Sequence, residues 1–171
     1  RNYINRLEMR TLSLFVLILF LFSACQQERK CFNKEDEVSK IEAVLEHYAI
    51  ANENQDFKLI EKIWATDDDI VLIGTHANEK LIGWDQIQKA IKKQYSEFED
   101  TYISVIEQKI TINETGNTAW FSEFMNFNFI HEGEAMSFEG IRFTGVLEKR
   151  GENWLIVQGH LSVPGGASAL E

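Results

Sequence analysis

The carboxy-terminal stretch "IRFTGVLEKRGENWLIVQGHLSVP", residues 141–164, carries the clearest fold signal in the chain. Two runs rich in β-branched and aromatic residues flank the polar turn "RGEN" at 150–153, which is the pattern of a long β-hairpin. Segments of the same kind precede it, separated by the turn sequences "NETGN" and "EGE". The sequence therefore predicts four consecutive antiparallel strands over residues 101–113, 118–131, 135–149 and 154–163.

Before these strands, apolar residues recur at the spacing that is typical of amphipathic helices. From Val38 onward, apolar residues recur every three or four positions and predict a helix that ends near Asn52. Asp56 is the expected N-cap of a second, shorter helix. "IVLIG" at 70–74 predicts a short buried strand, and "EKLIGW" at 79–84 predicts its return.

A third helix is predicted from a capping box. Asp85 is followed three residues later by Gln88, and the expected inward face of this helix reaches Phe98. Helices followed by consecutive long strands indicate an α+β fold, with three helices on one side of an antiparallel sheet. Because strands of this length twist strongly, we expect a cone-shaped α+β barrel with an interior cavity.

Charge and residue spacing exclude several functions. The formal net charge of −10 argues against nucleic-acid binding, which depends on lysine and arginine neutralising phosphates. His76, His160 and Glu123 are metal-ligating residue types, but their spacing matches no metal signature, so we expect no metal. The sequence predicts no cofactor.

The amino terminus resembles an export signal. The apolar run from Leu12 to Phe22 follows Met9, the expected start, and Arg10, and it is shorter than the roughly 20 residues that span a bilayer. The "FSAC" sequence at 22–25 resembles a bacterial lipobox and predicts lipid attachment to Cys25. An ordinary export signal and a retained membrane helix are the alternatives.

We therefore expect four parts of the chain: a signal peptide over 1–24, the lipidated cysteine and a tether over 25–35, a folded domain over 36–164 and a tail over 165–171. Cys31 in the tether is expected to be an unpaired thiol, with an intermolecular disulfide as the alternative. The predicted location is the bacterial cell envelope, with the protein anchored to a membrane by lipid.

The order of elements, together with "WDQIQKAIKKQY" at 84–95, "GNTAWFSEF" at 116–124 and the segment 141–164, resembles the SnoaL-like, nuclear transport factor 2-like superfamily and its ketosteroid isomerase-like members. The resemblance implies a curved sheet around a deep pocket and a homodimer formed through the outer face of the sheet. Tyr48 stands where those isomerases use a tyrosine to polarise the substrate oxygen. Their carboxylate base would fall at Ile73 or Gly74, so steroid isomerisation is disfavoured.

Strand alternation gives a second set of candidates. Because successive side chains of a strand point to opposite faces, His160 and Ser162 are expected to share a face with Trp154, and Arg142 on the preceding strand to lie close to His160. The family resemblance suggests that this face lines the pocket. Glu123, inside the apolar "AWFSEFMNF", is expected to reach the same cavity and to pair with Arg142 or His160.

This cluster has three interpretations: a satisfied polar network that fixes the sheet, a ligand-recognition site, or an acid-base site. His160, Glu123 and Tyr48 are the catalytic candidates, and Arg142 suits a carboxylate ligand because its guanidinium donates two parallel hydrogen bonds. The expected ligand-binding residues are Tyr48, Trp64, Trp84, Phe121, Glu123, Arg142, His160 and Ser162.

The leading functional hypothesis is an exported pocket domain that binds a small, partly apolar molecule. The alternatives are an acid-base enzyme of isomerase, dehydratase or hydrolase type, and a dimeric protein-association module. Fold resemblance alone does not choose between them, because this superfamily carries many unrelated functions on one scaffold.

Overall fold

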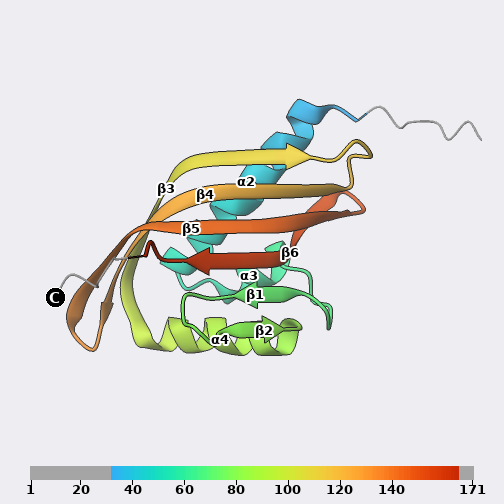
Figure 1. Cartoon of the computed structure of the whole chain (residues 1–171). Helices are drawn as coiled ribbons and strands as arrows, with labels where there is room; N and C mark the ends of the chain where they lie inside the picture. Colours follow the sequence, from blue (N-terminus) through green and yellow to red (C-terminus); the bar gives the residue numbers. More distant parts are fainter. Residues whose placement is uncertain (1–31, 166–171) are drawn as a thin grey trace, which may run out of the picture. The chain divides into compact units, whose positions relative to one another are not determined.

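The computed structural model describes residues 32–165, which form three helices and one six-stranded sheet. The predicted signal peptide, Cys25, Cys31 and the tail from residue 166 onward lie outside the described residues. Figure 1 shows the sheet with the helices along one of its faces. The predicted α+β class, with three helices on a strongly curved sheet, is confirmed.

The first described helix, α2 (Lys34–Glu53), begins earlier than the sequence predicts. Asn33 is its N-cap and accepts a hydrogen bond from the backbone of Glu35, and acidic residues in the first turn complement the positive end of the helix dipole. Phe32 packs against the core, and a Cβ at Gly116 would lie only 2.5 Å from its ring. The folded part therefore includes residues 32–35, which are predicted from the sequence to belong to the tether.

Helices α3 (Phe57–Ile63) and α4 (Trp84–Glu97) are capped differently. Asp56 caps α3 as predicted, accepting a hydrogen bond from the backbone of Leu59 at 3.1 Å. The predicted capping box at Asp85 is wrong, because the N-cap of α4 is Gly83 with φ of +80°. A Cβ at Gly83 would lie 2.9 Å from the backbone oxygen of Asp68. Glycine suits this position because it tolerates the positive φ and has no Cβ to clash with that oxygen.

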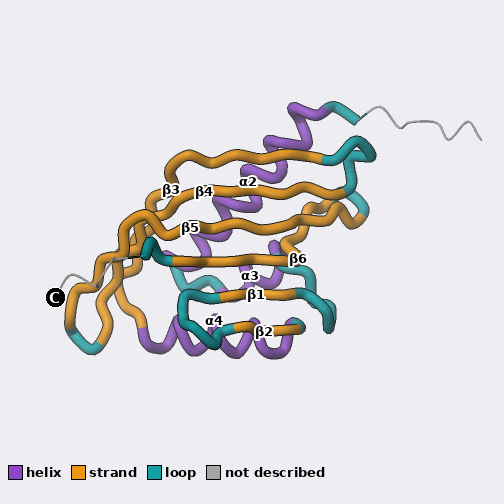
Figure 2. Tube along the Cα trace, in the orientation of Figure 1, coloured by secondary structure: helices purple, strands orange, loops and turns teal. Residues whose placement is uncertain are grey.

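The strands are β1 (Val71–Ile73), β2 (Lys80–Ile82), β3 (Phe98–Ile112), β4 (Thr118–His131), β5 (Glu134–Arg150) and β6 (Asn153–Ser162). Their order in the sheet is β2-β1-β6-β5-β4-β3, and β1 runs parallel to β6 while the other neighbours are antiparallel. The predicted antiparallel succession of four long strands is confirmed, and Figure 2 shows how far β3, β4 and β5 extend and curl.

The sheet has an inner face toward the helices and an outer face opposite. Residues directly opposite one another on neighbouring strands point to the same face. Phe121, Phe143 and Leu147 mark the inner face, where each is buried in the core. Trp120, opposite Val146, marks the outer face and is half exposed.

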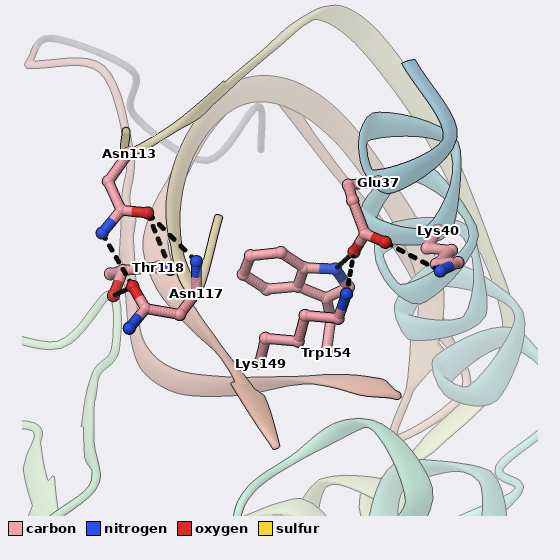
Figure 3. A network of polar contacts seen from close by, with 7 residues as sticks. All are labelled: Glu37, Lys40, Asn113, Asn117, Thr118, Lys149 and Trp154. Atoms are coloured by element: carbon pink, nitrogen blue, oxygen red, sulfur yellow. Dashed lines mark hydrogen bonds and ion pairs between the residues drawn. The ribbon is translucent and has the colours of Figure 1, made fainter. Parts of the chain in front are cut away.

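Glu37 ties the start of α2 to the β5–β6 hairpin (Figure 3). One carboxylate oxygen accepts hydrogen bonds from Trp154 Nε1 at 2.7 Å and from Lys149 Nζ at 2.8 Å, and the other pairs with Lys40 Nζ at 2.8 Å. Burial raises the pKa of Glu37, but the hydrogen bonds from Lys149, Lys40 and Trp154 outweigh it and lower the pKa to about 2. This ion cluster around the buried carboxylate of Glu37 joins α2 to the β5–β6 hairpin.

Candidate functional site

Four of the predicted site residues meet on the inner face of the sheet around Phe143. Tyr48 from α2 lies with its ring centroid 4.7 Å from that of Phe143, and Phe121 meets the same ring edge-on at 4.8 Å. Glu123 is directly opposite Phe143 on the neighbouring strand β4. A Cβ at Gly159 would contact both Trp64 and Phe143, so Trp64 belongs to the same group.

The two paired glycines Gly145 and Gly159 leave room for these aromatic rings. A Cβ at Gly145 would lie 2.7 Å from the ring of Phe121 and 2.3 Å from the backbone oxygen of Gln158. A Cβ at Gly159 would lie 3.1 Å from Trp64 and 3.3 Å from Phe143. Glycine in a strand interior often marks such a close approach, and here it makes space for bulky side chains on the inner face.

Glu123 is the buried acid of this group, with 2 % of its surface exposed. Gln108 Nε2 on β3 donates a hydrogen bond of 2.7 Å to Glu123 Oε2. Within the described part of the chain, Glu123 Oε1 has no hydrogen-bond partner. Buried polar atoms are nearly always satisfied, so an unpartnered carboxylate oxygen on an aromatic inner face calls for a reason.

The surroundings of Glu123 perturb its chemistry and that of Tyr48. Burial disfavours the carboxylate and raises the pKa of Glu123 to about 7, even though the hydrogen bond from Gln108 acts in the opposite direction. Burial, followed by the charge of Glu123, raises the pKa of Tyr48 well above its ordinary value. Tyr48 therefore stays a neutral phenol, while Glu123 changes charge near neutral pH and can either accept or donate a proton.

Trp64 supplies a second unsatisfied atom. Its Nε1 is buried without a hydrogen-bond partner among the described residues, and the side chain is 1 % exposed. An indole N–H donates only, whereas the free oxygen of Glu123 accepts when ionised. The inner face therefore carries one unused donor and one unused acceptor among apolar rings. A few polar groups within an apolar lining are the usual composition of a small-molecule site.

Arg142, His160 and Ser162 lie on the other face of the sheet, which corrects the prediction that they share a face with Glu123. Arg142 is exposed and directly opposite Ser162, and His160 is opposite Thr144. Glu123 therefore pairs with Gln108 and not with Arg142 or His160. In the register of β5 and β6, Arg142 and His160 are diagonal neighbours on the outer face.

A β-bulge in β6 explains the error. The register passes from Val146 opposite Gln158 to Leu147 opposite Ile156, which leaves Val157 as an extra residue. A one-residue bulge reverses the alternation that follows it. Trp154 and Ile156, before the bulge, point inward. After it, Gly159 and Leu161 face Gly145 and Phe143, the inward positions that a regular strand would give to Gln158 and His160.

Trp84, the remaining predicted ligand residue, stands at the start of α4. It is half buried and stacks on Phe57, with ring centroids 6.0 Å apart. Lys92 of α4 places its Nζ over the same Phe57 ring, 4.1 Å from the ring centroid. These contacts hold two helices together, and the ligand-binding role of Trp84 stays a prediction.

An open groove of about 380 Å³ runs between α2 and the edge strand β3. Its lining contains Gln108, the residue that hydrogen-bonds to the buried Glu123. The complete lining is Glu42, Glu46, Ala49, Ile50, Glu53, Ile103, Val105 and Gln108. Sequence reasoning missed this groove, although Glu42, Glu46 and Glu53 recur at helical spacing beside the apolar face of α2.

The described residues hold neither a membrane span nor a metal cluster. Over residues 32–165, no helix has the length and apolar character needed to cross a membrane. In the same range, no three His, Cys, Asp or Glu side chains gather as potential metal ligands.

Comparison with known proteins identifies the family. Residues 41–166 match the SnoaL-like domain, and the chain belongs to this family. A search of curated proteins gives no match. The family contains both ligand-binding and enzymatic members, so membership is compatible with the leading hypothesis and with its enzymatic alternative.

Solved structures show the same fold. A nuclear transport factor 2-like superfamily protein from Salmonella enterica is 18 % identical, with a TM-score of 0.71, and the match covers 81 % of this chain and 99 % of that one. A protein of this family from Streptomyces avermitilis, proposed to be a dehydratase, is 15 % identical with a TM-score of 0.70 and coverage of 77 % and 99 %. A proposed calcium/calmodulin dependent protein kinase II association domain from Xanthomonas campestris is 20 % identical, with a TM-score of 0.64 and coverage of 74 % and 87 %. At these identities the likeness concerns the fold.

Proposed function

We propose that this domain binds a small, partly apolar molecule on its inner face, with Glu123 as the polar anchor. The observation that carries the proposal is the free oxygen of a carboxyl group that is 2 % exposed, on a face lined by Tyr48, Phe121 and Phe143. A ligand donor group that reaches Glu123 Oε1 would satisfy it. The aromatic rings would then cover the apolar remainder of the ligand.

Ligand-induced thermal stabilisation over a set of small molecules tests this proposal. A ligand that binds only the folded state raises the unfolding temperature by mass action. Compounds that stabilise the wild type should lose that effect in Glu123→Gln, which keeps the side-chain shape but loses the carboxylate. Arg142→Met is the matched control, because Arg142 is exposed on the outer face. Equal stabilisation of all three proteins would contradict the assignment of the anchor.

Acid-base catalysis is the second candidate, and one observation favours it. A pKa of about 7 for Glu123 matches what a general acid or base needs at neutral pH, and the neutral phenol of Tyr48 lies on the same face. His160 lies on the outer face and therefore has no role in this acid-base hypothesis. Its test is turnover of any stabilising compound, which must disappear in Glu123→Gln and persist in Arg142→Met.

We further propose that the domain forms a homodimer through an outer-face patch made of Tyr102, Ile106, Trp120 and Phe124. These side chains are exposed to 61 %, 47 %, 49 % and 39 %. Large apolar side chains gathered on one sheet face are typical of an interface between proteins. The dimer would leave the inner face free for ligand.

Export and lipid attachment complete the proposal. Cys25, preceded by the apolar run 12–22, is the expected site of lipidation, and the tether would hold the domain at a membrane surface in the cell envelope. Metabolic labelling with a fatty acid tests this directly. The expected result is a labelled wild type and an unlabelled Cys25→Ala; label retained in Cys25→Ala would refute the assignment.

A further inference from the structure

The groove between α2 and β3 combines apolar walls with negative charge. Three of its lining side chains are glutamates from α2, and no lysine or arginine is among its lining residues. Ile50 and Val105 are apolar groove residues that remain 37 % and 39 % exposed. Exposed apolar surface bordered by carboxylates complements a molecule that has both an apolar body and a positive charge.

The groove connects with the buried acid through one hydrogen bond. Gln108 lines the groove and donates to Glu123 Oε2 at 2.7 Å, so Glu123 lies directly behind a residue of the groove wall. The other carboxyl oxygen of Glu123, Oε1, has no partner among the described residues. Only 2 % of the surface of Glu123 is exposed to solvent. Gln108 therefore stands between the acidic groove and an unsatisfied buried carboxyl group.

Local backbone geometry places Gln108 in this position. The pairing of β3 with β4 shifts between Ile106 and Lys109, and Glu107 adopts φ of +53°, which marks a bulge. The bulge lets Gln108 reach Glu123 from an edge strand. At another point of the groove, Glu53 accepts a hydrogen bond of 2.8 Å from the backbone of Ile103, which joins the helix to the strand.

We propose that this groove is the entry and recognition site for an organic cation with an apolar body, such as an alkylammonium compound, and that its ammonium group pairs with Glu123. The inference rests on the proposed small-molecule function and names the ligand class. Glu42 and Glu46 attract the cation at the surface, and Ile50 and Val105 contact its apolar chain. The ammonium then donates to the free oxygen of Glu123, beside the amide of Gln108.

Charge and volume both agree with this ligand class. A net charge of −10 favours encounter with cations. A groove of about 380 Å³ lies within the range of small-molecule sites, so a single chain of modest length fills it. An anion of the same length would meet three carboxylates in the groove and a fourth behind Gln108. Selectivity for cations over anions is therefore a direct consequence of the lining.

Thermal unfolding with n-octylamine, n-octanoate and n-octanol tests the inference on the whole chain. The three probes have the same chain length and differ in charge at neutral pH. Octylamine at ten times its dissociation constant should raise the unfolding temperature by about 3 °C or more, and octanoate should leave it unchanged. Glu42→Gln/Glu46→Gln should weaken octylamine binding roughly three- to ten-fold, and Glu123→Gln by about ten-fold or more.

Two further variants sharpen the comparison. Glu35→Gln/Asp36→Asn removes two exposed acids of the same helix outside the groove and should leave octylamine affinity unchanged. Gln108→Ala opens the path to Glu123 and should not abolish binding. Equal octylamine affinity in the wild type, the groove variant and Glu123→Gln would overturn the inference.

The probes also separate this inference from the proposed function. If octanol and octanoate bind as well as octylamine, and Glu123→Gln weakens all three, the proposed small-molecule function with Glu123 as anchor stands and the preference for cations is wrong. If none of the three shifts the unfolding temperature, the cation inference is overturned. The pocket itself is then judged by the broader set of compounds.

Discussion

The carboxylate of Glu37, at the start of the first described helix, accepts a hydrogen bond of 2.7 Å from the indole of Trp154, which lies 117 residues further along the chain. Lys149 reaches the same oxygen at 2.8 Å (Figure 3). This contact joins α2, the first helix of the described residues, to the β5–β6 hairpin. The inner face that holds Glu123 depends on that joint, because Tyr48 belongs to the same helix.

Glu37→Gln should destabilise the domain by roughly 2–4 kcal/mol at pH 7, because it leaves the partly buried Lys149 without its counter-charge. Glu37 has a lowered pKa in the folded state, so its contribution is present above pH 4.5 and is lost as the pH falls toward 2. Chemical denaturation between pH 2 and 7 measures both effects. Glu35→Gln, an exposed acid two residues away on the same helix, is the control and should cost little.

Glu123→Gln should stabilise the domain above pH 7 and change its stability little below pH 4.5. The pKa of Glu123 is raised to about 7 in the folded state, so ionising it opposes folding increasingly as the pH rises from 4.5 to 7. The expected gain above pH 7 is roughly 2–3 kcal/mol. Denaturation of both proteins at pH 4.5 and pH 8 measures it, and an identical difference at the two pH values would contradict the raised pKa.

Gly145→Ala should destabilise the fold more than Gly159→Ala. A Cβ at Gly145 would lie 2.3 Å from the backbone oxygen of Gln158, which cannot move without disturbing β6. A Cβ at Gly159 meets only side-chain atoms, at 3.1 Å or more. We expect about 1–3 kcal/mol for Gly145→Ala from overpacking. Equal losses of stability in the two variants would show that contact with neighbouring side chains, and not the clash with the backbone oxygen of Gln158, determines the cost of the added methyl group.

Trp120→Glu/Phe124→Glu should abolish the proposed dimer without unfolding the domain, because both side chains are exposed on the outer face. Charged groups facing one another across an apolar interface oppose association. Sedimentation velocity over a range of concentrations measures the effect. Ile82→Glu, an equally exposed apolar position on β2, is the matched control and should still dimerise.

The sequence predicted the inner-face residues well where the strands are regular. β4 contains no extra residue, so alternation correctly placed Phe121 and Glu123 together, and the family resemblance named Tyr48, which lies on the same inner face. It failed for His160, because the bulge at Val157 has no distinctive sequence signal and reverses the alternation. Family resemblance placed Arg142 in the pocket, whereas cross-strand pairing puts it on the outer face.

The groove could not have been predicted from sequence for a related reason. Gln108 reaches Glu123 only because β3 bulges at Glu107, and a glutamine on an edge strand is otherwise an ordinary exposed residue. The helical spacing of the α2 glutamates indicates one acidic wall of the groove. The other wall belongs to β3, some 50 residues away in the sequence. Such contacts depend on register, which local patterns do not specify.

Carboxyl ¹³C NMR of Glu123 across a pH titration, with and without octylamine, tests the central claim most directly. In the free protein we expect a midpoint near pH 7, and bound octylamine should lower it because a cation favours the ionised carboxylate. Octanoate should not lower it. A midpoint near the ordinary glutamate value of about 4.3, unchanged by octylamine, would contradict both the buried anchor and its cationic ligand.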